Sequence, residues 1–304
     1  MNSWSKILGA GLLGLACFDF GVLAAKPSAG CGKTPTLTAG NHTLTVNSKE
    51  RWYLLKLPEN YSNSHPYRLI FTLHAAGGNS SMVADGVGGY RKFPNPSFCK
   101  LRVILTSPVP WYGLPALVKD DIGAIYVNPN GLNKGWANQG GEDITLMSDI
   151  LSSVKSDLCI DENLVFSVGF SYGASMSYSI ACSLGKDFRA VAAQSGGNMS
   201  GCVGGNDPVG FYGEHGVDGD LNIANARAAR DRFVKNNGCT PQDNIVSPAV
   251  GSGTHIKTVY KGCKEGYPVT WIEYDGGHTP QPKDKGASKT FAADETWEFF
   301  SQFK

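Results

Sequence analysis

Apolar residues in this chain gather in short uninterrupted runs that alternate with longer amphipathic stretches. The short runs are typical of strands buried on both faces of a parallel sheet. They span residues 51–57, 67–73, 124–127, 164–168, 190–193, 209–212 and 269–274. The amphipathic stretches predict helices over residues 142–158, 172–182, 224–234 and 294–303. This alternation predicts an α/β fold, with helices on both faces of a mostly parallel sheet.

A single catalytic domain, residues 31–304, accounts for most of the chain. The full length of 304 residues fits one large domain better than two small ones. The sequence contains no internal repeat, and no Ser/Thr/Pro-rich linker leads to a second module. We therefore expect one domain without a large cap.

The first 25 residues have the pattern of a secretory signal peptide. Lys6 precedes a largely apolar run over residues 7–22, and Ala24 and Ala25 offer small residues for cleavage. The run is too short for a membrane anchor, and Asp19 interrupts it. These features predict export and no membrane partner.

Composition and charge exclude several classes of function. Charged residues make up 17% of the chain and the formal net charge is +1, so the sequence lacks the basic face of a nucleic-acid-binding protein. The eight cysteines lack the paired spacing of a zinc site, which favours disulfides in an oxidising compartment over metal binding. We expect a secreted, extracellular protein without cofactor or metal. Sequons that permit N-glycosylation begin at Asn41, Asn60, Asn79 and Asn198.

Residues 164–173, with the sequence LVFSVGFSYG, carry the most informative motif. An apolar strand leads into Gly-x-Ser-x-Gly and a predicted helix follows, which is the pattern of a nucleophile elbow. Such a sharp turn brings backbone segments so close together that Gly169 and Gly173 must lack side chains. The context predicts Ser171 as the nucleophile, with the N–H of Tyr172 as one donor of the oxyanion hole.

His278 is the predicted general base. It follows the apolar run 269–274 and a Gly-Gly turn. In proteins with a nucleophile elbow, the catalytic histidine stands downstream of the serine, in a loop after a late strand. His42 and His65 precede the nucleophile, which is the wrong chain order. His255 is expected in a polar loop with no predicted strand before it.

The acid that orients the histidine should follow a strand between Ser171 and His278. After the run 209–212, the sequence offers Asp218 and Asp220, whereas Glu214 is expected to belong to the strand end. We favour Asp218, with Asp220 as the alternative.

A second oxyanion donor is expected near His74, where the predicted strand 67–73 runs into His-Ala-Ala-Gly-Gly. The position resembles the loop that supplies this donor in α/β-hydrolases. Ala75 is the favoured donor and Ala76 the alternative. His74 itself is interpreted as a residue that holds the loop.

With these motifs placed, the chain resembles the fungal feruloyl esterases of the first carbohydrate-esterase family, which are related to bacterial polyhydroxybutyrate depolymerases. The resemblance runs from Cys31 to the C-terminus. It rests on Cys31-Gly-Lys-Thr-Pro-Thr-Leu, His74-Ala-Ala-Gly-Gly, Gly135-Trp-Ala-Asn-Gln-Gly-Gly-Glu-Asp-Ile, Gly169-Phe-Ser-Tyr-Gly, Asn236-Asn-Gly-Cys-Thr-Pro and Trp271-Ile-Glu-Tyr-Asp-Gly-Gly-His.

The resemblance implies an α/β-hydrolase fold and hydrolysis of feruloyl esters on the arabinoxylan of plant cell walls, which releases ferulic acid. It maps the family nucleophile onto Ser171 and the base onto His278. In relatives the acid stands four residues after the histidine of a His-Gly loop, which here is Gly219. A one-residue deletion before Asp218 would restore the match. Trp136 and Tyr172 are candidates either for contact with the feruloyl ring or for ordinary packing.

Two other functions compete with this interpretation. An esterase of the same fold with another acyl preference, such as an acetylxylan esterase or a polyester depolymerase, would carry the same elbow. A catalytically inactive wall-binding protein would keep the fold without the chemistry.

Residues 91–111 are interpreted as a foreign segment. They carry four basic residues, no acidic residue, four prolines and Cys99, the odd cysteine of the chain once Cys17 leaves with the leader. The flanking segments look continuous in the family once these residues are removed, as a retained intron would explain. The alternative is a genuine surface loop. The foreign-segment interpretation predicts six remaining cysteines in three disulfides, and places the segment outside the core.

Overall fold

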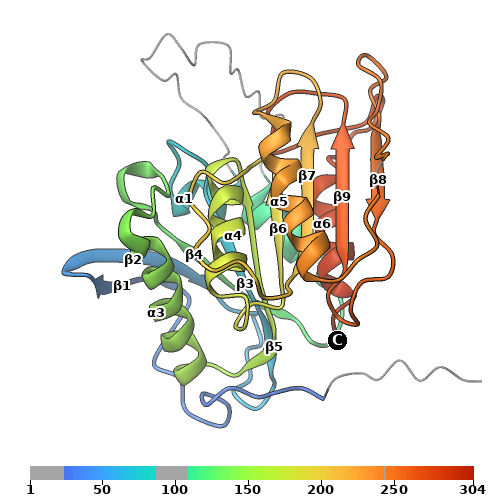
Figure 1. Ribbon diagram of the computed structural model, residues 1–304. Coiled ribbons are helices and arrows are strands. Elements are labelled where there is room, and N and C mark those ends of the chain that lie inside the picture. The colour runs from blue at the N-terminus through green and yellow to red at the C-terminus, as the bar shows by residue number, and fades with distance from the viewer. Residues whose placement is uncertain (1–23, 87–108, 243) are drawn as a thin grey trace, which may run out of the picture.

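The computed structural model describes residues 24–86, 109–242 and 244–304, which form a nine-stranded sheet covered by helices (Figure 1). In spatial order the strands are β1 (Gly40–Val46), β2 (Lys49–Lys56), β4 (Ala124–Pro129), β3 (Tyr67–Leu73), β5 (Ile160–Phe170), β6 (Ala190–Gln194), β7 (Gly210–Gly216), β9 (Val269–Tyr274) and β8 (His255–Val259). The six strands β4, β3, β5, β6, β7 and β9 are parallel, whereas β1 pairs antiparallel with β2, β2 with β4, and β8 with β9. This confirms the predicted fold class.

The helices cover both faces of the sheet (Figure 1). Those described are α1 (Ser80–Ala84), α2 (Leu114–Leu117), α3 (Glu142–Asp157), α4 (Tyr172–Ser183), α5 (Ile223–Asn236) and α6 (Ala292–Ser301). One apolar cluster joins the sheet to α3, α4 and α5, and a second joins it to α2 and α6. Side chains along each strand alternate between these clusters, because successive residues point to opposite faces. In β3, for example, Leu69 and Phe71 enter the first cluster and Ile70 enters the second.

All seven predicted strands and all four predicted helices are present within a few residues of the expected bounds. Two strands were missed, β1 and β8, and both lie at sheet edges. Their residues are mostly exposed or half-buried, so neither strand carries the continuous apolar run that marks a buried strand. The prediction that His255 lies in a loop was therefore wrong, because it begins β8.

Three disulfides tie distant parts of the chain together: Cys31–Cys159, Cys182–Cys202 and Cys239–Cys263. The predicted number of three is confirmed. Cys17 and Cys99 lie outside the described residues, as does almost all of the predicted signal peptide.

Most of the segment 91–111 lies outside the described residues, but its last part is placed. The Trp111 side chain is 8% exposed and packs in the second apolar cluster, with its ring centroid 5.8 Å from that of Tyr126. The prediction that the whole segment lies outside the core is therefore wrong at Trp111, because this large aromatic ring fills space under the sheet. Nearby, the N–H of Val109 donates to the carbonyl of Gly86 over 3.2 Å, so these residues lie side by side.

Across the described residues, no helix is both long enough and apolar enough to cross a bilayer.

Candidate active site

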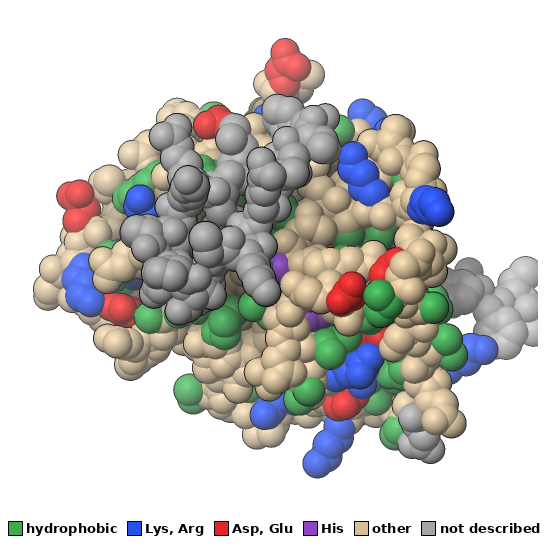
Figure 2. Space-filling view, turned by 90° about the horizontal axis from the view of Figure 1, so that it is seen from above, with side chains coloured by type: hydrophobic (Ala, Val, Ile, Leu, Met, Phe, Trp, Pro, Cys, Tyr) green, Lys and Arg blue, Asp and Glu red, His purple; other side chains and the backbone are tan. Residues whose placement is uncertain are grey.

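Ser171 occupies a sharp turn between β5 and α4. This turn lies at the carboxyl edge of the parallel strands (Figure 1). Its backbone has φ 58° and ψ −116°, a conformation that side-chain-bearing residues rarely adopt. A Cβ on Gly169 would collide with the backbone of Gly173, and a Cβ on Gly173 would collide with the carbonyl of Leu73. The two glycines thus allow the close approach that the sequence predicted, and the turn lifts Ser171 to the sheet edge. Viewed onto this edge, the molecule has histidine at its surface near the centre (Figure 2).

A chain of two hydrogen bonds links three side chains at this edge. The Ser171 Oγ lies 2.8 Å from Nε2 of His278, and Nδ1 of His278 lies 2.6 Å from Oδ1 of Asp220. The carboxylate can only accept, so Nδ1 of His278 carries a proton. Its Nε2 is then free to accept the proton of the serine hydroxyl. All three side chains are buried or nearly so.

The structure contradicts the choice of Asp218 as the acid. Asp218 is exposed, whereas Asp220 reaches the imidazole. The reason is the turn after β7: Gly219 adopts φ +72°, which folds the chain back so that Oδ2 of Asp220 accepts from the N–H of Gly216 over 2.8 Å. The expected one-residue deletion before Asp218 is therefore wrong: the acid, Asp220, stands five residues after His215, one more than the four that the resemblance implied.

The Asp220 carboxyl is held by several groups besides His278. Its Oδ2 lies 3.2 Å from Nδ1 of His215 and 3.4 Å from the hydroxyl of Tyr274. Burial alone would raise the pKa of Asp220. The hydrogen bond from His278, the charges that His215 and His278 carry when protonated and the bond from Gly216 outweigh burial, and the pKa lies below its ordinary value. The carboxyl is therefore ionised at neutral pH and stabilises a positive charge on His278.

His74 holds the loop between β3 and α1, as the sequence interpretation expected. Its Nε2 accepts from the N–H of Gly131 over 3.0 Å, so its Nδ1 carries the proton and donates to the carbonyl of Ala75 over 2.8 Å. Burial lowers the pKa of His74 to about 4, which keeps the ring neutral near pH 7. This fixed ring positions Ala75.

Of the two candidate aromatic contacts, Trp136 has a packing role. Its side chain is 0% exposed, and its ring N–H donates to the carbonyl of His74 over 2.7 Å. Tyr172 is half-buried and lies against Gly135. Neither ring lines the pocket described next.

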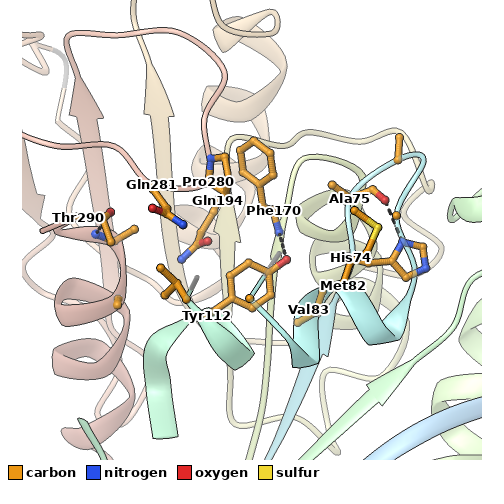
Figure 3. Close-up of a pocket in the computed structure, with 16 residues that line it drawn as sticks. His74, Ala75, Met82, Val83, Tyr112, Phe170, Gln194, Pro280, Gln281 and Thr290 are labelled. Atoms are coloured by element: carbon orange, nitrogen blue, oxygen red, sulfur yellow. Dashed lines mark hydrogen bonds between the residues drawn. The ribbon is translucent and has the colours of Figure 1, made fainter. Parts of the chain in front are cut away.

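A mostly apolar pocket is lined by Phe170, the residue before the serine (Figure 3). The Phe170 ring centroid lies 4.5 Å from that of the His278 imidazole. The pocket is lined by His74, Ala75, Ala76, Gly78, Met82, Val83, Gly86, Val109, Tyr112, Phe170, Gln194, Pro280, Gln281, Thr290, Ala292 and Ala293. An acyl group bound to Ser171 would therefore find an apolar cavity next to it.

The site does not have the form of a metal centre. In the part of the chain that the structure describes, no group of three or more His, Cys, Asp and Glu side chains is placed to hold a metal ion.

Comparison with known proteins identifies similar sequences that are named as feruloyl esterases. No protein-family model matches the chain. The chain is 48% identical over 284 residues to feruloyl esterase D of Neurospora crassa, which covers 93% of this chain and 92% of that protein. It is 44% identical over 280 residues to feruloyl esterase C of Emericella nidulans, with 90% of each chain covered.

The chain belongs to the fungal feruloyl esterase family. It is a carboxylic ester hydrolase, and the predicted family resemblance is confirmed. Among solved structures, a ferulic acid esterase from Anaeromyces mucronatus, determined with ferulic acid, superposes with a TM-score of 0.53 at 15% identity, over 89% of this chain and 91% of that chain. This likeness supports the esterase fold.

Sequence analysis of this chain missed three of its pocket residues: Tyr112, Phe170 and Gln194. The Tyr112 hydroxyl donates to the carbonyl of Leu73 over 2.6 Å and accepts from the N–H of Phe170 over 3.0 Å, so it supports both β3 and the elbow. Gln194 ends the apolar run of β6, and a polar residue in that place was the available signal. Phe170 lies within the Gly169-Phe-Ser-Tyr-Gly motif, but at a variable position of the elbow pattern, and Tyr112 belongs to none of the motifs named above.

Proposed function

We propose that this protein is a secreted serine esterase that hydrolyses feruloyl ester bonds on arabinoxylan of plant cell walls and releases ferulic acid. The observation that carries the proposal is the hydrogen-bonded chain from Ser171 through His278 to Asp220. The near-full-length similarity to proteins named feruloyl esterases supports the acyl group.

In the first half-reaction, Nε2 of His278 takes the proton of Ser171 as the Oγ attacks the ester carbonyl. Asp220 stabilises the imidazolium and keeps the ring in the required tautomer. The N–H of Tyr172, at the first turn of α4, has no partner within the helix and is free to bind the developing negative oxygen. The N–H of Ala75, beside the same pocket, is the proposed second donor.

His278 then gives the proton to the oxygen of the departing sugar, which completes the first half-reaction and leaves the acyl group on Ser171. In the second half-reaction, water attacks the acyl-enzyme with His278 as base, His278 returns that proton to the Ser171 Oγ, and the free acid departs. Each proton is taken up and returned by His278, so the sequence of steps balances without a cofactor.

Secretion is supported by the leader-like pattern of residues 1–25 and by the three disulfides, which form and persist in oxidising compartments. Of the four sequons, Asn41, Asn60 and Asn198 are exposed. Asn79 is half-buried and caps α1, with Oδ1 accepting from the N–H of Met82 over 3.0 Å. Glycosylation is therefore expected at the three exposed positions first.

Release of ferulic acid from arabinoxylan and from methyl ferulate tests this function. Acetylated xylan and short polyester products serve as competing substrates. Faster turnover of either competitor would reassign the acyl group. Polysaccharide binding without hydrolysis and without labelling of Ser171 by a serine reagent would indicate an inactive wall-binding protein.

A further inference from the structure

The apolar pocket lined by Phe170, proposed here to hold the acyl group, has one polar end. Most of its lining is apolar, with Met82 and Val83 on one side, whereas Gln194, Gln281 and Thr290 gather on the other (Figure 3). The Thr290 hydroxyl is already engaged, because it donates to the carbonyl of Pro282 over 2.7 Å.

Gln194 is held firmly at this end. Its backbone carbonyl accepts from the N–H of Ser171 over 2.8 Å, which fixes it beside the elbow. Its side-chain Nε2 donates to the hydroxyl of Thr296 on α6 over 3.0 Å. With the nitrogen fixed on the helix, the position of the amide oxygen is set as well.

The amide oxygen of Gln194 lacks a hydrogen-bond donor. The residue is 1% exposed, and its Oε1 is buried without a partner within the protein. A buried acceptor left unpaired is costly, and native structures rarely contain one without a reason. Gln194 also lines the pocket, so a bound molecule can supply the missing donor.

We propose that Oε1 of Gln194 accepts a hydrogen bond from the phenolic hydroxyl of the substrate's acyl group. This inference rests on the proposed function and adds the residue that selects hydroxylated cinnamoyl esters. An aromatic acyl group fits the apolar lining, and its hydroxyl is the donor that a methoxy group cannot provide. A site built to bond a hydroxyl discriminates strongly against analogues that lack it, because its polar group is then left unpaired.

The carboxyl of Glu214 is the competing donor. It stands opposite Gln194 in the β6–β7 register, and its own Oε1 is also unpartnered. If a proton on Glu214 satisfied the amide oxygen, the pocket would show no preference for hydroxylated acyl groups. Preference for hydroxylated over unhydroxylated esters therefore distinguishes a substrate hydroxyl from Glu214 as the donor to Gln194.

The experiment compares kcat/KM for methyl 4-hydroxycinnamate and methyl cinnamate, which differ by one hydroxyl. We expect the wild-type protein to prefer the hydroxylated ester by about tenfold or more. Gln194→Met keeps the length of the side chain and removes the acceptor, so the preference should fall to within about twofold. Gln242→Met, the same substitution at an exposed position outside the pocket, is the matched control and should keep the wild-type preference.

Equal turnover of the two esters by the wild-type protein, or a preference that survives Gln194→Met, would overturn the inference. If Gln194→Met does not fold, inhibition of the wild type by 4-hydroxycinnamic and cinnamic acids replaces it. Binding about tenfold tighter for the hydroxylated acid supports the proposal, and equal binding overturns it. Hydrolysis of p-nitrophenyl acetate with no hydrolysis of either cinnamate would instead overturn the proposed function itself.

Discussion

Two loops at the carboxyl edge of the sheet carry the two ends of the hydrogen-bonded chain, and they are built in opposite ways. The turn from β5 to α4 is crowded, since any side chain on Gly169 or Gly173 would meet backbone atoms. The loop from β7 to α5 is open: Asp218 and Gly219 are exposed, and a Cβ on Gly219 would come no nearer than 3.9 Å to any neighbouring atom.

This difference explains which part of the site the sequence could reveal. In the crowded turn few residue types are sterically possible, so the spacing of the glycines identifies Ser171. In the open loop many sequences are possible, and two aspartates two positions apart are equally plausible from composition. A functional residue can therefore be predicted from sequence where steric crowding restricts its neighbours, whether or not it is the most important residue chemically.

The largest expected effect comes from the crowded turn. Ser171→Ala should lower turnover of methyl ferulate by on the order of 10⁴-fold or more while the protein folds normally. Steady-state kinetics and a circular dichroism spectrum check this. Wild-type turnover would end the serine-esterase mechanism.

In the open loop, the effect of removing a carboxylate should depend on which aspartate is changed. Asp220→Asn should reduce kcat by about 10³- to 10⁴-fold, because the amide no longer stabilises the charged imidazole or fixes its tautomer. Asp218→Asn, at an exposed position, is the matched control and should leave kcat within about twofold. The reverse order in parallel kinetic assays would restore Asp218 as the acid.

An alanine substitution should lower the free energy of unfolding more in the crowded turn than in the open loop. Gly173→Ala places a methyl group against the carbonyl of Leu73 and should destabilise the fold by about 3 kcal/mol or more. Gly219→Ala meets open space but keeps a left-handed backbone, and should cost about 1–2 kcal/mol. Urea unfolding of the two variants measures the difference, and similar midpoints would show that the turn is less crowded than the structure indicates.

The strand before the open loop contains a further test. Glu214 is fully buried on β7, where its Oε2 accepts from the Tyr212 hydroxyl over 2.6 Å and burial raises its pKa from 4.5 to about 8. The folded protein therefore holds a proton that the unfolded chain releases above pH 4.5. Stability should fall as pH rises from about 4.5 to about 8 and then level off.

Glu214→Gln removes this titration and should flatten that part of the profile. Melting temperatures between pH 5 and pH 8 for the two proteins check it. A wild-type profile parallel to that of the variant would mean that Glu214 does not titrate in this range.

A small effect on turnover is expected from deleting residues 91–108, the part of the segment interpreted as foreign that precedes the pocket residue Val109 and the core residue Trp111. Their removal should leave the activity within a few-fold, because the length of an inserted loop costs little free energy. The deletion variant should have no free thiol once the leader is removed, since six cysteines form the three disulfides. Sequencing of mature transcripts is the direct test, and transcripts that all encode these residues would contradict the interpretation.

Most of the fold was predictable because the central strands are buried on both faces and their sequences are continuous apolar runs. The edge strands β1 and β8 were not, since half-exposed residues blur that pattern. In the site, motifs located Ser171 and the His74 loop, and a strand followed by a Gly-Gly turn located His278. Asp220 and Gln194 depend on how loops and neighbouring strands fold together, which no local pattern records.

The hydrogen bond between Gly86 and Val109 has a consequence for how such an enzyme diversifies. These residues are far apart in the sequence but adjacent in space, and both line the pocket. A peptide inserted between them has its two ends close together in space. Its length therefore affects the rest of the domain little. The two ends of such an addition lie at the pocket, because Gly86 and Val109 both line it. Selection, or a library built at this junction, can thus vary substrate range by insertion while the hydrolytic machinery stays untouched.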